Sequence, residues 1–159
     1  MKRTVAIGGA VLVLTLAASA HVWAQGDPFA GTWKLNLAKS KYYSATPPKS
    51  EVRTYEVQGD GEKLTVNGVA ADGSRVSWGY SVRFDGKDYA ITGAGPNGAD
   101  AIAVRRVNAR KVEATLKKGG KVMETASRTV SEDGKTMTAT AKTAGPNGTP
   151  LFVIVYDKQ

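Results

Sequence analysis

The sequence predicts an all-β fold, a single up-and-down antiparallel β-barrel of about ten strands (eight to ten), preceded by a signal peptide. Short runs rich in Val, Thr, Tyr and Ile recur about every 8 to 12 residues, with Gly-containing turns between them. One run alternates strictly between apolar and polar residues, which is typical of a strand with one buried face. The chain also begins with charged, then apolar, then small residues, the order found in exported proteins.

The N-terminal segment has the composition of a secretory signal peptide. Lys2 and Arg3 precede an apolar run that ends at Leu16, and four small residues follow it. The small residues predict cleavage after Ala20 or after Ala24. The rival interpretation is an uncleaved membrane anchor, since the apolar run is close to the minimum of about 17 residues for a spanning helix.

The chain therefore divides into a signal peptide over residues 1–24 and one barrel domain over residues 25–159. We expect an exported protein, periplasmic or secreted, with no membrane span once the signal is removed. The chain has no cysteine, so the core must stabilise the domain without disulfides. A domain of this length buries about two thirds of its unfolded surface, which is enough for one core.

The expected strands are the runs between the turns. They cover residues 31–36, 51–57, 63–68, 74–84, 88–92, 100–107, 111–116, 121–130, 136–142 and 151–156. The clearest alternation is in the fourth run, whose apolar face consists of Val76, Trp78, Tyr80, Val82 and Phe84. A period of two with polar residues opposite indicates one buried and one solvated face.

The connections between these strands are of two kinds, which alternate along the chain. Tight turns lie at residues 59–61, 85–86, 108–110 and 132–134, and mostly longer loops lie at 37–50, 69–73, 93–99 and 143–150. Successive connections of a meander lie at opposite ends of the sheet, so one end is expected to be closed and the other to carry the loops. Closure into a barrel is favoured over an immunoglobulin-like sandwich because the connections are sequential hairpins.

The loop end is expected to form a rim around the barrel. Lys41, Tyr42 and Tyr43 belong to its first loop, and Asn97 and Asn147 occupy equivalent places in two copies of the sequence Ala-Gly-Pro-Asn-Gly. A turn is sufficient to explain this repeat, because proline presets one turn position and Asn-Gly accepts a left-handed backbone.

The first and last strands resemble those of the calycin superfamily, which contains the lipocalins and the fatty-acid-binding proteins. Residues 29–35, with the Gly-x-Trp motif ending at Trp33, resemble the opening of these barrels, in which the Trp closes the base. Residues 153–158 are similar to the last strand of fatty-acid-binding proteins, and 31–42 with 155–159 resemble small secreted lipocalin-like bacterial proteins.

Two departures from the fatty-acid-binding pattern bear on the ligand. The arginine that captures a carboxylate two residues before the final-strand tyrosine, Tyr156, is replaced here by Ile154. An arginine from another strand, Arg106 or Arg128, would have to reach the interior instead. The two lid helices are also missing, since residues 37–50 contain two consecutive prolines, and a loop lid is expected in their place.

The composition argues against catalysis. The one histidine is His21, at the signal boundary, and without His or Cys there is no imidazole base, thiolate or His-ligated zinc. Glu124 could act as an acid or base if desolvated, but its place four residues from Arg128 favours an ion pair. We therefore expect no enzyme, no metal and no cofactor.

The predicted function is the binding of a small hydrophobic or amphipathic molecule in the lumen. The candidate lumen residues are Trp78, Tyr80, Phe84, Arg106, Arg128 and Tyr156. Room for a ligand would come from small residues expected to face inward, namely Ala101, Ala103, Ala114, Ala126, Ala139 and Ala141.

The alternative is an envelope interaction module without a small-molecule ligand, whose aromatic residues are ordinary core. The whole chain has a formal net charge of +8, and the mature domain, without Lys2 and Arg3, would meet an anionic envelope surface with a charge of 8 − 2 = +6. Nucleic acid is not an expected partner, because the basic residues are spread along the chain rather than gathered in a stripe.

Overall fold

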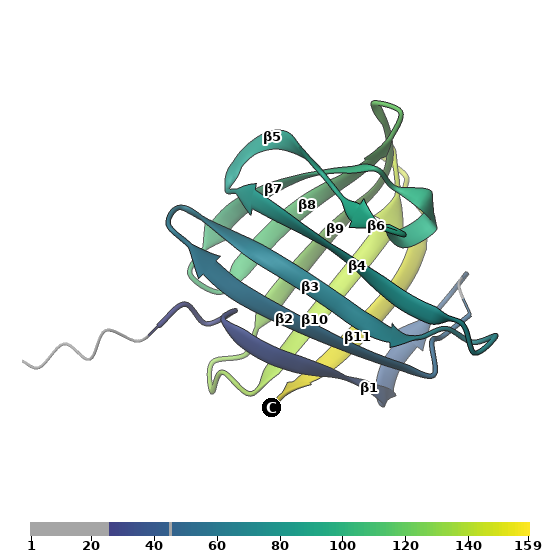
Figure 1. Cartoon of the computed structure of the whole chain (residues 1–159), viewed down its shortest axis with the longest axis horizontal. Coiled ribbons are helices and arrows are strands. Elements are labelled where there is room, and N and C mark those ends of the chain that lie inside the picture. Colours follow the sequence, from purple (N-terminus) through teal and green to yellow (C-terminus); the bar gives the residue numbers. More distant parts are fainter. Residues whose placement is uncertain (1–25, 45) are drawn as a thin grey trace, which may run out of the picture.

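The computed structural model describes residues 26–44 and 46–159 (Figure 1). The predicted signal peptide lies outside the described residues. The elements are β1 (Gly31–Tyr42), β2 (Ser50–Gln58), β3 (Gly61–Val69), β4 (Arg75–Arg83), β5 (Asp85–Ala90), β6 (Thr92–Gly93), the short 3-10 helix η1 (Pro96–Gly98), β7 (Ala101–Asn108), β8 (Lys111–Lys118), β9 (Lys121–Val130), β10 (Thr136–Thr143) and β11 (Pro150–Lys158). In the described part of the chain, no helix is long and apolar enough to span a membrane.

The strands form one antiparallel sheet that curls into a nearly closed barrel. Its order is β5-β7-β8-β9-β10-β11-β1-β2-β3-β4-β6. β5 lies at one edge of the sheet and pairs with β7. β6, which follows β5 directly in the chain, pairs with Trp78 and Gly79 of β4 at the other edge. The short connection from β5 to β6 therefore brings the two edges together. In Figure 1, β2, β3 and β4 cross in front of β8 to β11. The predicted all-β meander barrel is confirmed.

The strand count is slightly above the predicted range of eight to ten, because the expected strand at residues 88–92 is divided in two. Its first part belongs to β5 and pairs with β7, whereas its end belongs to β6 and pairs with β4. Ile91 lies between them and donates its backbone N–H to Asp100. The split follows from closure, since this segment must change partners to cross the gap between the sheet edges.

The first strand is longer than expected, which corrects the predicted loop at residues 37–50. β1 continues to Tyr42, and its pairing with β11 shifts between Asn36 and Lys41. The Ser40 hydroxyl fills this irregularity, donating to the Asn36 carbonyl (2.7 Å) and accepting from the Val155 N–H (3.0 Å). Lys41 and Tyr42 therefore lie on a strand rather than in a loop.

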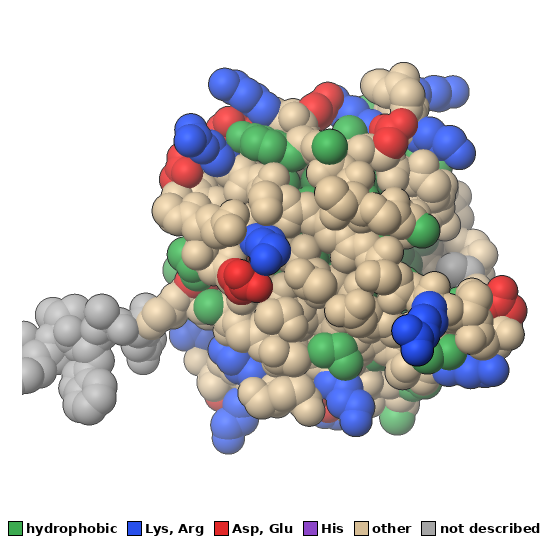
Figure 2. Space-filling model, in the orientation of Figure 1, with side chains coloured by type: hydrophobic (Ala, Val, Ile, Leu, Met, Phe, Trp, Pro, Cys, Tyr) green, Lys and Arg blue, Asp and Glu red, His purple; other side chains and the backbone are tan. Residues whose placement is uncertain are grey.

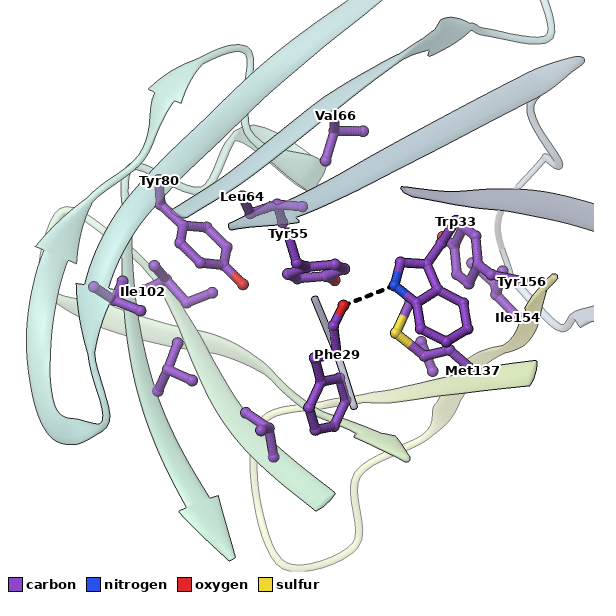
Figure 3. Close-up of a cluster of buried hydrophobic side chains, with 14 of the residues drawn as sticks. Phe29, Trp33, Tyr55, Leu64, Val66, Tyr80, Ile102, Met137, Ile154 and Tyr156 are labelled. Atoms are coloured by element: carbon purple, nitrogen blue, oxygen red, sulfur yellow. Dashed lines mark hydrogen bonds between the residues drawn. The ribbon is translucent and has the colours of Figure 1, made fainter. Parts of the chain in front are cut away.

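The end with the tight turns is closed by the segment that precedes β1. Phe29 is buried inside this end, and Trp33 is fully buried, with its indole Nε1 donating to the Phe29 carbonyl at 2.8 Å (Figure 3). Asp27 supports the segment by accepting from the Phe29 N–H, and Gly31, with φ of 116°, turns the chain into β1. Phe29 and Trp33 together form the floor of the barrel.

On the face shown in Figure 2, the basic side chains are separated rather than gathered in one patch. In the view of Figure 2, Lys and Arg appear at separate points around the molecule, with acidic groups between several of them. Several of these residues form exposed ion pairs, such as Lys63 with Glu56 and Arg83 with Asp60. Such pairs contribute little to stability because water screens them.

Candidate ligand-binding site

The interior of the barrel contains a cavity of about 830 Å³. Its apolar lining includes Leu64, Val76, Trp78, Ile102, Leu116 and Ile154. Loop residues at the end opposite the floor also line it, among them Ser44, Pro48, Ala94, Pro96 and Thr149. The cavity therefore extends from the barrel centre to the end that carries the loops.

Small side chains make part of this space. Ala114, Ala126 and Ala139 line the cavity, as predicted from their alternation. Ala101 and Ala103 do not, because the buried neighbours Ile102 and Val104 occupy the inward positions of β7. The predicted inward orientation of Ala101 and Ala103 is therefore wrong. The prediction was shifted by one residue along the strand, and such a shift places a side chain on the opposite face of the sheet.

A charged triad lies deep in the lumen, near the floor. Arg128 on β9 donates to the Glu62 carboxylate on β3 and to the Tyr80 hydroxyl on β4 (3.0 Å), and Tyr80 in turn donates to Glu62 (2.9 Å). The Arg128 guanidinium also lies 4.6 Å from the centre of the Tyr55 ring. Burial, with the nearby carboxylate, holds the pKa of Tyr80 well above its usual value, so this hydroxyl remains a donor.

The predicted ion pair between Glu124 and Arg128 is wrong, because Arg128 pairs with Glu62 instead. Residues four apart on a strand share a face, but their backbones are separated by about 13 Å. Glu62 instead reaches Arg128 from the opposite wall of the barrel, a neighbour that strand alternation cannot indicate.

A second charged cluster, which sequence reasoning missed, lies on β2. Arg53 Nε donates to the Glu51 carboxylate at 2.7 Å, and the Tyr156 hydroxyl donates to the same oxygen at 2.6 Å. The Arg53 guanidinium lies 4.8 Å from the centre of the Tyr156 ring and 5.8 Å from that of Trp78. The sequence did contain a signal for this cluster. Glu51, Arg53 and Tyr55 are spaced two residues apart, so the two charged residues share a face of the strand with an aromatic residue that is buried.

The Glu51 carboxylate is held ionised by its partners. Burial acts to raise its pKa, but the Arg53 guanidinium and the hydrogen bonds from Tyr156 and Arg53 outweigh burial and leave the pKa below its usual value. Glu51 and Arg53 thus form a compensated ion pair on the cavity wall.

Glu124 on β9 is the third lumen carboxylate, and it lies in a different environment. It is 4 % exposed and accepts one hydrogen bond, at 3.0 Å, from the side-chain amide of Asn97. Within residues 26–44 and 46–159, no Lys or Arg is within ion-pair distance of it. Burial raises its pKa, and the Asn97 hydrogen bond and the charge of Arg53 offset that rise only in part.

The two Ala-Gly-Pro-Asn-Gly segments therefore differ in their structural roles. Asn97 has a left-handed backbone (φ 53°), lines the cavity and reaches Glu124. Asn147 lies in the turn between β10 and β11 and does not line the cavity.

The other predicted site residues separate into two groups. Trp78, Tyr80, Arg128 and Tyr42 line the cavity, whereas Phe84, Arg106, Tyr156, Lys41 and Tyr43 do not.

Arg106 lies at the floor of the barrel. Its guanidinium donates a hydrogen bond to the Asp27 carboxylate (2.5 Å) and lies 4.4 Å from the centre of the Phe84 ring. The predicted lumen positions of Arg106 and Phe84 are thus corrected, because Phe29 fills the barrel beside them. Tyr156 is fully buried in the barrel core, on the same face of β11 as the cavity-lining Ile154, and contacts the site through Glu51.

Several buried polar atoms at the lumen lack a hydrogen-bond partner in the described part of the protein. They are the hydroxyls of Tyr42 and Tyr55, Glu62 Oε2 and Arg128 Nε. Burial raises the pKa of Tyr42 to about 12, with the Glu51 charge adding to the effect, so this hydroxyl is neutral at physiological pH. Such groups can orient a guest that carries polar atoms.

The polar side chains of the lumen provide charges and hydrogen-bonding groups. Among the described residues, no three His, Cys, Asp or Glu side chains are grouped so that they could hold a metal ion. Both lumen arginines are paired with carboxylates, and Glu124 lines the cavity with no ion-pair partner in the part of the chain that the structure describes.

Comparison with solved structures identifies the type of barrel. Zebrafish ileal bile acid-binding protein complexed with cholic acid shares 16% identity over 83% of this chain and 99% of its own, with a TM-score of 0.53. Rv2717c from M. tuberculosis shares 16% identity over 83% of this chain and 93% of its own, with a TM-score of 0.51. A fatty acid-binding protein from Drosophila melanogaster brain shares 16% over 81% and 98%, with a TM-score of 0.49.

The chain is a hollow antiparallel meander barrel with the same fold as these solved structures, which confirms the fold that the predicted resemblance implied. No protein-family model matches the chain, and no curated protein sequence is similar to it. At 16% identity the similarity to the solved barrels concerns the fold.

Proposed function

We propose that this chain is an exported binding protein that holds a small apolar or amphipathic ligand inside its barrel. The observation that carries this proposal is the cavity of about 830 Å³, which lies within the range of roughly 300–1,000 Å³ typical of ligand pockets. Its lining is mostly apolar, with a few polar groups placed among the apolar side chains. This combination suits a molecule with a large apolar part and some polar atoms.

The position of the cavity supports the same function. One end of the barrel is filled by Phe29 and Trp33, so a ligand would enter at the loop end and stop above the floor. The zebrafish barrel, which shares this fold, was crystallised with cholic acid, an amphipathic molecule. Export is proposed from the N-terminal segment, whose composition is that of a signal peptide.

Native mass spectrometry of the protein isolated from its own host tests this function. The expected result is a mass excess that is released on denaturation and identified as a small molecule. A barrel that is isolated empty and is not stabilised by any member of a library of apolar and amphipathic compounds would contradict the proposal. It would favour an interaction module with a basic surface.

A pair of variants on β8 tests whether the ligand occupies the lumen. Ala114 lines the cavity, whereas its neighbour Thr115 alternates to the outer face. We expect Ala114→Phe to abolish binding of the recovered ligand by filling the lumen and Thr115→Phe to leave binding unchanged. Thermal unfolding of both variants without ligand shows whether each remains folded.

A further inference from the structure

We propose that the lumen selects amphipathic ligands with a cationic head group, an ammonium ion that binds the Glu124 carboxylate near the mouth. This inference rests on the proposed function and assigns its ligand class. It follows from how the charges inside the barrel are paired.

The positive charges of the two lumen arginines are already balanced by buried carboxylates. Arg53 is bound to Glu51 at 2.7 Å, and Arg128 is bound to Glu62 and to Tyr80. An anionic head group at either guanidinium would lie beside the glutamate that is already paired with it. Two carboxylates would then share one positive charge in a medium of low dielectric constant, which is unfavourable.

The negative charge of Glu124, unlike those of Glu51 and Glu62, is not balanced by a paired arginine among the described residues. Glu51 and Glu62 are each paired with an arginine, but among the described residues Glu124 has a neutral amide as its hydrogen-bond donor. When Glu124 is ionised, the lumen therefore carries one uncompensated negative charge. An ammonium group would supply the missing positive charge and up to three donors.

The location of Glu124 suits a head group. It pairs with Thr143, the last residue of β10, and Asn97 from the loop end lies beside it. The apolar side chains of Leu64, Ile102 and Ile154 line the same cavity and would contact the apolar part of the guest. A molecule with an ammonium group at the mouth and an apolar body in the lumen satisfies both regions.

Three ligands with the same twelve-carbon chain test the inference: dodecylammonium, 1-dodecanol and dodecanoate. Their affinities are measured by isothermal titration calorimetry at pH 7.5, below the concentrations at which they aggregate. We expect dodecylammonium to bind the unmodified protein about tenfold or more tightly than dodecanoate, since its charge is compensated and that of dodecanoate is not. This comparison requires no variant.

Glu124→Gln then tests the residue itself, because glutamine can still accept the Asn97 hydrogen bond but carries no charge. We expect the variant to bind dodecylammonium about tenfold more weakly and 1-dodecanol with unchanged affinity. Glu113→Gln is the matched control, since it removes the same charge from β8 at a partly exposed site where Glu113 pairs with Lys111. It should leave all three affinities unchanged.

Each outcome supports or overturns the assignment. Dodecanoate binding as tightly as dodecylammonium overturns the cationic selectivity while leaving the ligand-binding function intact. Equal effects of Glu124→Gln and Glu113→Gln on dodecylammonium show that overall charge, not Glu124, determines the affinity, and overturn the assigned site. Binding of none of the three overturns the inference together with the proposed function for amphiphiles of this type.

Discussion

Arg128 on β9 and Glu62 on β3 form an ion pair across the lumen, joining walls that lie five strands apart in the sheet order. Their side chains are 8% and 4% exposed, so water screens the pair little. The pair links two strands that share no backbone hydrogen bonds. We expect it to make β3 and β9 unfold together.

Arg128→Met should destabilise the protein strongly, by about 3–5 kcal/mol, because Glu62 would remain buried without its counter-charge. Urea unfolding followed by circular dichroism measures the change. The double variant Arg128→Met with Glu62→Gln should recover most of the loss, since it removes the unpaired charge. Arg83→Met at an exposed ion pair is the control and should change stability little. A small effect of Arg128→Met would contradict a stabilising role for the buried pair.

Tyr156→Phe should lower the free energy of unfolding by about 1.5–3 kcal/mol, because a buried hydroxyl that donates to an ionised Glu51 is lost. Chemical denaturation measures the loss. Tyr89→Phe removes a similar hydroxyl bond, to Asp85, from an exposed site and serves as the control with no measurable change expected. Equal stability of the two variants would contradict a structural role for the Tyr156 hydroxyl.

Trp78 should report ligand binding by its fluorescence, since it lines the cavity, whereas Trp33 is enclosed in the floor. Adding a bound ligand should shift or quench the emission of the Trp33→Phe variant, which retains Trp78. The same ligand should leave the emission of Trp78→Phe nearly unchanged. A response that persists in Trp78→Phe and disappears in Trp33→Phe would place the ligand at the floor instead.

Glu124 should make the protein less stable as the pH rises. Its pKa is raised in the folded state, so the folded protein binds more protons than the unfolded chain between the two pKa values. Stability therefore falls as the pH increases from the unfolded pKa through the folded pKa, and no further loss follows above it. The charge of Arg53 and the Asn97 amide reduce this effect without reversing it.

The test of this pH dependence is the difference in melting temperature between Glu124→Gln and the unmodified protein from about pH 4 to pH 8. The variant should gain relative stability as the pH rises, because it has no carboxylate to ionise. Glu113→Gln, on the partly exposed side chain, should show no such trend. A constant difference across the range would mean that the folded pKa of Glu124 is not raised.

The sequence predicted the strands well, because strand signals are local. The alternation in residues 74–84 correctly indicated the buried face of β4, where Trp78, Tyr80 and Val82 are enclosed. The glycine-containing turns correctly separated the two ends of the meander, since a turn depends on a few adjacent residues. The extension of β1 was missed, because it depends on Ser40 filling an irregularity against β11.

The candidate site was only partly predictable. Tyr80 was assigned to the lumen from alternation, and Arg128 as a substitute for the missing final-strand arginine. Arg53 was overlooked because a charged residue normally marks the outer face. Arg106 is at an inward position near its strand end, where the N-terminal segment covers it. Its place at the floor depends on Asp27 and Phe29, which are far from it in the sequence.

The amino-acid sequence by itself determined that this chain forms an antiparallel meander with one buried face, because a two-residue period and tight turns act over short distances. The tertiary structure decided which charges meet inside the barrel. Glu62 and Arg128 are 66 residues apart, and only closure of the sheet brings them together. The same closure brings Arg128 to the opposite wall, whereas no Lys or Arg among the described residues forms an ion pair with Glu124.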